Sequence, residues 1–177
     1  MDKQYEKIIN FHGHSCPGLA IGYRMTLAAM KYLNLNMADD EELVAVVEND
    51  ACGVDALQFL SGCTFGKGNL IFKDFGKPVY TFYDRKSQKA VRVYCNREKI
   101  PEQIRTNRSN YINWLLNLEH KDFLELQLVK MEEPQKAMIR NSLKCDYCGE
   151  YVMETRIKKI KHKNICLPCS VKLTIEN

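Results

Sequence analysis

The segment FHGHSC places His12, His14 and Cys16 at every second position. In an extended loop, side chains two residues apart point to the same side, so these three can share one face. Imidazole and thiolate together suit zinc, and also iron, nickel or copper. Core residues are seldom so polar and so close together. The segment therefore predicts one end of a metal site, whose remaining ligands must come from farther along the chain.

A second set of candidates follows in CGVD and in the glycine-rich stretch SGCTFGKGN. Cys52 opens an expected helix, and Asp55 lies one helical turn later, where it could act as a general base or orient a histidine. Cys63 is a further candidate ligand, and Lys67 is a candidate for holding an anionic substrate group. The catalytic candidates are Cys52, Asp55 and Lys67. The candidate metal ligands of the main domain are His12, His14, Cys16, Cys52 and Cys63.

Both Cys16 and Cys52 are expected at helix N-termini, which stabilise negative charge, so we expect lowered pKa values for their thiols. A thiolate at neutral pH is a metal ligand or a nucleophile. A metal-free thiol enzyme, with Cys52 as nucleophile and a histidine as base, is therefore an alternative. The other alternative is that single cysteines belong to the core, as we expect for Cys95, which alternates with Val91 and Val93.

The glycine-rich stretch does not fit a nucleotide phosphate loop. Three residues separate Gly62 from Gly66, where four are required, and Gly68 stands where Ser or Thr should bind magnesium. This excludes a nucleoside triphosphatase. The backbone amides of the loop remain possible hydrogen-bond donors to a bound anion.

The C-terminal part of the chain contains two CxxC pairs separated by 17 residues. This is the spacing of a four-cysteine structural zinc site, here formed by Cys145, Cys148, Cys166 and Cys169. A segment of about 44 residues cannot bury enough apolar surface to fold unaided, whereas four thiolates around zinc can hold it. A hairpin between the pairs and a helix after Cys169 would make a treble-clef-like zinc finger. The alternatives are a redox CxxC or four unrelated buried thiols.

Charge is distributed unevenly. Residues 1–133 carry 17 Lys or Arg against 18 Asp or Glu, whereas residues 134–177 carry nine against four. Attraction to an acidic protein, or less favourably to nucleic acid, would therefore be a property of the tail. With neither an apolar run of about 20 residues nor a secretory signal, we expect a cytoplasmic protein with no membrane partner. In that compartment the eight cysteines would stay reduced.

Hydrophobic periodicity predicts an α+β fold, an antiparallel sheet with packed helices. Helices are expected over residues 1–10, 17–33, 53–60, 100–120 and 121–131, and strands over residues 43–50, 69–75, 78–85 and 90–96, the last three antiparallel. Cys16 should be the N-cap of the second helix, because proline suits the first helical position. A charged linker at residues 132–134 would separate a metal-binding domain, residues 1–133, from the zinc finger, residues 134–177.

The stretches FHGHSCPGLAIGYRM and CGVDALQFLSGCTFGKGNL strongly resemble the FmdE family, named for one component of molybdenum formylmethanofuran dehydrogenase. The resemblance covers about residues 5–130, and the tail is similar to the zinc-finger extension of some members. It implies an α+β core, commonly dimeric, with a metal or active-site groove lined by the motif residues. It also implies an association with one-carbon metabolism in methanogens.

From these observations we expect a metal-binding protein, and the resemblance implies an accessory or enzymatic component of one-carbon, methanogenesis-type metabolism. A structural zinc ion is expected in the tail and a second transition metal, zinc, in the core. The expected partners are a second copy of the chain and a protein docked by the zinc finger. The alternative function is a binding module, in which the basic tail docks protein or nucleic acid and the main domain is a scaffold.

Overall fold

The computed structural model describes residues 2–175 and divides the chain into two compact units, Met1–Ala137 and Met138–Asn177. The expected linker at residues 132–134 lies within the first unit. Arg85 holds this segment, because its guanidinium donates to the Glu133 carboxylate at 2.7 Å and to the carbonyl oxygens of Pro134 at 2.7 Å and Gln135 at 3.3 Å. The charges of this segment therefore attach it to the first unit, and the division falls at residue 137.

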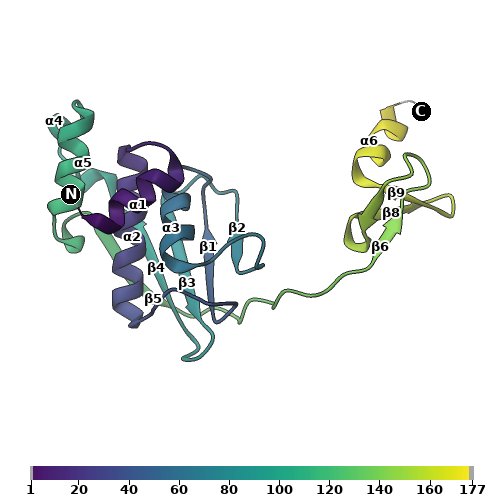
Figure 1. The fold of residues 1–177 in the computed structure, drawn as a ribbon, viewed down its shortest axis with the longest axis horizontal. Helices are drawn as coiled ribbons and strands as arrows, with labels where there is room; N and C mark the ends of the chain where they lie inside the picture. The colour runs from purple at the N-terminus through teal and green to yellow at the C-terminus, as the bar shows by residue number, and fades with distance from the viewer. Residues whose placement is uncertain (1, 176–177) are drawn as a thin grey trace. The chain divides into compact units, whose positions relative to one another are not determined.

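The first unit contains a five-stranded sheet in the order β2-β1-β3-β4-β5 (Figure 1). The strands are β1 (Leu43–Val47), β2 (Leu70–Phe72), β3 (Val79–Asp84), β4 (Lys89–Cys95) and β5 (Leu124–Val129). All neighbours are antiparallel except β1 and β2, which pair in parallel. The expectation that β2 would be antiparallel is wrong, because β2 returns through α3 to the outer side of β1.

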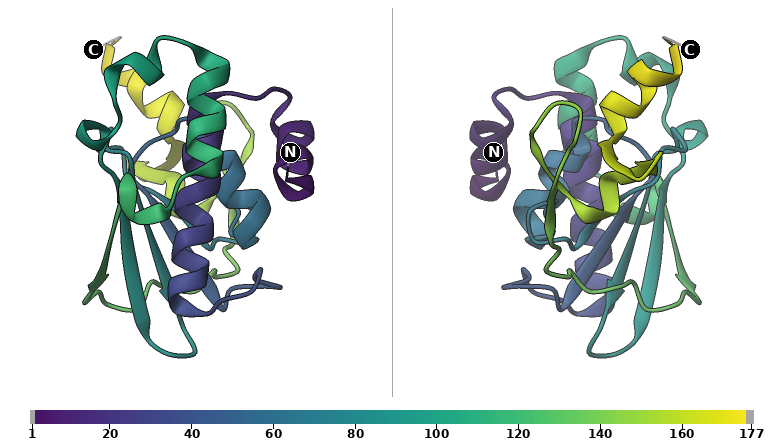
Figure 2. Two further views of the ribbon diagram at one scale, coloured as in Figure 1. Left: turned by 90° about the vertical axis from the view of Figure 1, so that its left-hand side faces the viewer. Right: turned by 90° about the vertical axis from the view of Figure 1, so that its right-hand side faces the viewer.

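Helices cover one face of this sheet (Figure 2). They are α1 (Lys3–His12), α2 (Pro17–Leu33), α3 (Gly53–Ser61), α4 (Glu102–Arg105) and α5 (Arg108–Asn117). The main core packs alternating sheet residues against α1, α2, α3 and α5, and Cys95 is fully buried within it. The other face carries a smaller cluster around Val44, Tyr83 and Ala90. The α+β fold with packed helices is confirmed.

Two expected helices differ from the structure. The helix expected over residues 100–120 is broken into α4 and α5, with Asn107 capping the second piece through its side chain. The prediction of a helix over residues 121–131 is wrong. This segment forms a short 3-10 turn, His120–Asp122, followed by β5. Strand β5 pairs with β4, from Leu124 opposite Cys95 to Val129 opposite Ala90. Leucine at every second position of this stretch fits a strand.

Helices α2 and α3 cross with their backbones in contact. A Cβ atom placed on Gly22 would lie 2.2 Å from the Gly53 carbonyl oxygen, closer than two atoms can approach. One placed on Gly53 would lie 2.6 Å from the Tyr80 hydroxyl oxygen. Only glycine therefore fits at this crossing. The crossing brings the first turns of the two helices side by side, and each of these turns begins at a cysteine.

The second unit consists of two hairpins and a helix. The hairpins are β6 (Ser142–Lys144) with β7 (Tyr151–Met153) and β8 (Ile157–Ile160) with β9 (Lys163–Cys166), and the helix is α6 (Leu167–Ile175). Its small core contains Ile165 and the buried thiols of Cys145, Cys166 and Cys169. A hairpin lies between the CxxC pairs as expected, and the arrangement is treble-clef-like.

In the part of the chain that the structure describes, no helix combines the length and apolar character needed to cross a lipid bilayer.

Candidate metal centres

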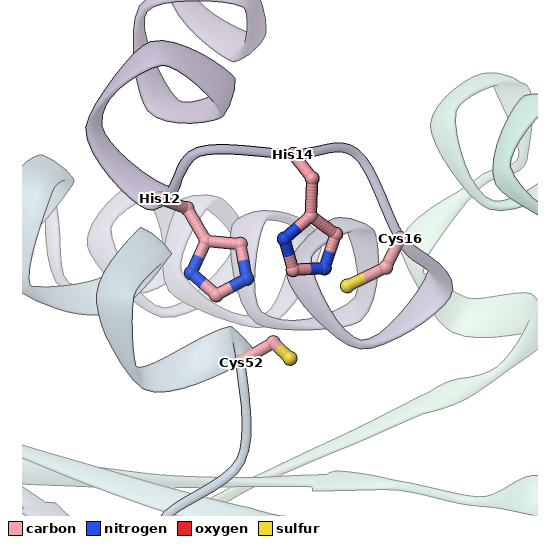
Figure 3. A group of neighbouring side chains, drawn as sticks. All are labelled: His12, His14, Cys16 and Cys52. Atoms are coloured by element: carbon pink, nitrogen blue, oxygen red, sulfur yellow. The ribbon is translucent and has the colours of Figure 1, made fainter.

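Four side chains from two stretches of the first unit, residues 12–16 and residue 52, converge on one point (Figure 3). The candidate ligand atoms of His12, His14, Cys16 and Cys52 all lie within 4.8 Å of one another. His12 ends α1, His14 lies in the following loop, and the two cysteines are the N-caps of α2 and α3. Two imidazoles and two thiols at this separation form a donor set for one transition-metal ion.

Backbone turns place these side chains. Gly13 has φ 94°, and its amide donates to the Ile9 carbonyl oxygen at 2.7 Å, so α1 stops directly after His12 and the chain turns back. The Cys16 sulfur accepts a hydrogen bond from the Leu19 amide at 3.3 Å, which caps α2. The Cys52 side chain makes no capping hydrogen bond, so its sulfur is available to the cluster.

His12 has the arrangement of a metal-ligating imidazole. Its Nδ1 atom lies 2.6 Å from Oδ2 of Asp55, and its buried Nε2 atom has no hydrogen-bond partner among residues 2–175. A carboxylate that accepts the Nδ1 proton leaves the lone pair on Nε2. Burying that lone pair without a partner is unfavourable, and a bound cation removes this penalty. The donor set and the unpartnered nitrogen therefore both fit a metal ion.

Gln58 supports the same pair of residues. Its amide donates to Oδ1 of Asp55 at 3.2 Å, so both oxygens of the carboxylate have partners. We did not expect this residue from the sequence. Its position three residues after Asp55, on the same helix, is the signal that would have indicated it.

The expectation of a lowered pKa at Cys52 is wrong. Burial raises the pKa of the Cys52 thiol, and the neighbouring Cys16 raises it further by hydrogen bonding and like charge. Desolvation and a second thiol thus outweigh the helix N-terminus. Without a cation these surroundings disfavour a thiolate at Cys52, which argues against this residue as a free nucleophile. A coordinated metal reverses the balance, because a coordinating thiol is deprotonated.

A cavity of about 470 Å³ opens beside the cluster. Its walls include His12, Cys52 and Asp55, and also the aromatic side chains of Phe65 and Phe72. His14 is the most exposed of the four candidate ligands, whereas the other three are buried or half-buried. The cavity therefore gives a small molecule access to His12 and Cys52, whereas His14 is exposed outside it.

Cys63 and Lys67 are not brought to this cluster. Cys63 is fully buried, its thiol donates to the Leu43 carbonyl oxygen at 3.4 Å, and burial raises its pKa to about 11. The Lys67 ammonium donates to the carbonyl oxygens of Ala38 at 3.1 Å and Asp39 at 3.4 Å. Both side chains thus stabilise the connection around β1 and β2, and their hydrogen bonds hold them there rather than at the cluster.

The second cluster consists of the sulfur atoms of the two CxxC pairs. All four sulfurs lie within 4.8 Å of one another, in a set formed by Cys145, Cys148, Cys166 and Cys169. Hydrogen bonds from the backbone amides of Cys148 and Cys166 lower the pKa of Cys145 to about 6, whereas hydrogen bonding with the Cys166 thiol raises that of Cys169 to about 12. All eight cysteines of the chain are unbridged. The tail therefore offers four thiols to one metal ion.

The fold and the two clusters define an α+β protein with two candidate metal centres. Residues 11–146 match the family described as "FmdE, Molybdenum formylmethanofuran dehydrogenase operon". The chain belongs to the FmdE family, and the resemblance of its two motifs is confirmed.

Two relatives extend this comparison. A protein of Archaeoglobus fulgidus, described as a probable S-adenosyl-L-methionine-binding protein, is 31% identical over 189 residues, which are 90% of this chain and 50% of the relative. The chain thus spans about half the length of this curated relative. The crystal structure of a tungsten formylmethanofuran dehydrogenase FmdE-like protein from Syntrophus aciditrophicus has a TM-score of 0.66 and 30% identity, covering 93% of this chain and 89% of that one.

Proposed function

We propose that this protein is a metal-binding component of one-carbon metabolism, in which His12, His14, Cys16 and Cys52 hold one transition-metal ion, zinc. The observation that carries the proposal is the buried and unpartnered Nε2 atom of His12, with Asp55 behind it at 2.6 Å. Family membership and the FmdE-like structural relative support the metabolic assignment. The same resemblance supports a homodimer.

When bound, zinc supplies Lewis acidity toward an oxygen atom of a substrate. The residues of the chain have separate parts in this proposal. Asp55 holds the Nδ1 proton of His12 and so fixes the tautomer that presents Nε2. Phe65 and Phe72 add apolar surface to the wall of the cavity. His14, as the exposed donor, is the one that a substrate can replace, since a catalytic site needs an open position. Cys52 is a ligand in this proposal, and Lys67 has no part in it.

Metal content tests the proposal. We expect two zinc ions per purified chain, and one after the double substitution Cys16→Ser and Cys52→Ser. Serine is also a good N-cap, so α2 and α3 keep their first turns while the soft donors are lost. The matched control is Cys63→Ser, which removes a buried thiol outside the cluster and should leave two ions. Elemental analysis of the folded proteins, with circular dichroism as a check on folding, gives the count.

One ion per wild-type chain, with the same content in the folded double variant, would contradict the core site. Loss of an ion in Cys63→Ser would show that Cys63 is needed for metal binding and that the proposed set of four ligands is wrong. If the wild-type protein has an enzymatic activity, its retention in Cys52→Ser would exclude Cys52 as a catalytic nucleophile.

A second candidate function is docking of an acidic protein segment through the zinc finger, and a groove on the second unit favours it. This groove has a volume of about 590 Å³, and its lining includes the apolar Ile160 and Ile165 and the basic Lys161 and Lys163. The one carboxylate among its described lining residues, Asp146, accepts a hydrogen bond from the Asn164 amide at 2.6 Å. Neither lysine is in a salt bridge with a described residue. An acidic segment with apolar residues fits such a groove, whereas nucleic acid would use the charge alone.

A further inference from the structure

A second cavity of the first unit lies on the other side of the loop that carries Cys52. Its volume is about 330 Å³, which is enough for a small organic ligand. Asn49 and Ala51 of this loop line both this cavity and the one beside the metal cluster. The two cavities therefore share a wall. Nothing in the proposed metal chemistry uses the second one.

The charge of this cavity is positive. Arg97 is the one charged residue among its described lining residues, and no carboxylate faces it there. Among the described residues Arg97 has no salt-bridge partner either. A guanidinium with its donors unpaired at the edge of a small cavity is suited to a planar anion, which it can bind through two parallel hydrogen bonds.

The interior of the cavity has a second donor. Tyr80 is 3% exposed, lines the cavity, and its hydroxyl has no hydrogen bond with a described residue. That hydroxyl lies against Gly53, the first residue of α3, since a Cβ placed there would be 2.6 Å away from it. Burial raises the pKa of Tyr80 well above its usual range, so the phenol stays protonated and can donate. The α3 N-terminus adds a partial positive charge at the same place.

We infer that this cavity binds a small organic carboxylate. Arg97 and the Tyr80 hydroxyl hold the carboxylate, and the apolar body of the ligand packs on Ile21, Met25 and Pro78, which also line the cavity. Apolar walls with a few placed polar groups are the usual composition of such sites.

Gly18 connects this site to the metal cluster. It lines the cavity, and a Cβ atom placed on it would lie 3.5 Å from Cβ of Cys52 and 3.8 Å from Sγ of Cys16. Because Gly18 has no side chain, the far end of a ligand can approach both thiols. A carboxylate bound here could be the substrate of the metal cluster, and that part of the inference rests on the proposed function. The inference that the cavity binds a carboxylate is independent of the proposed function.

Benzoate is a suitable probe, because benzamide has the same shape without the charge. Chemical shifts of the ¹⁵N-labelled full chain would be followed during titration with each compound. We expect benzoate to move the Gly53 amide and the Arg97 Nε resonances, and to bind at least about tenfold more tightly than benzamide. Tyr80→Phe should weaken benzoate binding by about tenfold to a hundredfold, as expected for loss of one hydrogen bond to a charged group. Arg97→Gln should weaken it at least as much, because it removes the positive charge and the pair of parallel hydrogen bonds. The matched control Arg105→Gln, outside the cavity, should bind as wild type does.

Equal affinities for benzoate and benzamide, or unchanged benzoate binding in Arg97→Gln, would overturn the inference. Metal content measured on the same samples separates the two proposals. Two ions per chain without benzoate selectivity would refute only the carboxylate site. Selective binding that depends on Arg97 in a chain with one ion would refute only the core metal site.

Discussion

At the scale of single residues, the hydrogen bond between Asp55 and His12 is the contact that most favours the proposed metal site over a chance meeting of polar side chains. The 2.6 Å contact fixes which nitrogen of the ring holds the proton, and the other nitrogen is buried without a partner in the described chain. Ligands held in this way lose less conformational freedom when they bind an ion. We therefore expect Asp55 to contribute to metal affinity without touching the metal.

Asp55→Asn tests this contribution. The amide can donate to Nδ1 and so favour the wrong tautomer, and we expect the affinity of the core site for zinc to fall by about tenfold to a hundredfold. Competition with a fluorescent chelator measures the affinity. Asp50→Asn is the matched control, because Asp50 lines the same cavity but makes no hydrogen bond to His12. Equal affinities in the two variants would show that the hydrogen bond does not orient the ligand.

At the scale of elements, the site depends on the crossing of α2 and α3 at Gly22 and Gly53. The two N-cap cysteines can meet because nothing separates the helix backbones there. A side chain added at either glycine would push the two helices apart and separate the N-cap cysteines. Packing in the core and assembly of the site are therefore set by the same contact.

Gly22→Ala should therefore lower both stability and metal affinity. Helix propensity alone would favour alanine by about 1 kcal/mol, but a Cβ atom 2.2 Å from backbone must push the helices apart. We expect the free energy of unfolding to fall by about 1–3 kcal/mol, measured by urea denaturation. Gly66→Ala is the control, since its Cβ would meet nothing within 4 Å. A stabilised Gly22→Ala protein with unchanged zinc affinity would contradict the role of the crossing.

Elements with a clear local pattern could be predicted from the sequence. Pro17 after Cys16 indicated the start of α2, and the β-branched residues of β1 and β4 indicated strands. The strand β5 could not be separated from a helix, because leucine suits both and the pairing partner of Leu124, on β4, is distant in sequence. The parallel pairing of β2 was missed for the same reason, since strand order is not a local property.

The candidate site divides in the same way. The spacing of His12, His14 and Cys16 indicated that they share a face, and Cys52 joins them because of the helix crossing. Cys63 belongs to the same sequence motif as Cys52, yet its chain leaves α3 through Gly62, at φ 71°, and turns into the core. The sequence motif alone therefore does not indicate that Cys52 faces the cluster while Cys63 is buried in the core.

At the scale of the whole molecule, the two units differ in charge as well as in fold. The groove that Lys161 and Lys163 line lies in the second unit, where basic residues are in excess. Docking through this unit should therefore depend on charge and be separable from metal binding in the core.

The double substitution Lys161→Glu and Lys163→Glu tests this separation. We expect binding of a fluorescent peptide of alternating glutamate and leucine, measured by anisotropy, to be lost, while the metal content stays the same. The control carries the same charge change on α1, Lys3→Glu and Lys7→Glu, and should bind as wild type does. Binding of a single-stranded RNA oligonucleotide in preference to the peptide would favour nucleic acid as the partner. Binding of neither probe would contradict the docking function.

The distribution of the proposed ligands along the chain determines when each centre can be filled. Cys145 to Cys169 belong to one short segment that has few apolar residues to hold it, so in the proposed assignment the tail would acquire its ion while it folds. Cys16 and Cys52 are 36 positions apart and meet only after α2 and α3 have packed. During metal starvation a newly synthesised chain would then keep an intact core with a vacant centre, while its zinc finger remained unfolded and open to proteolysis.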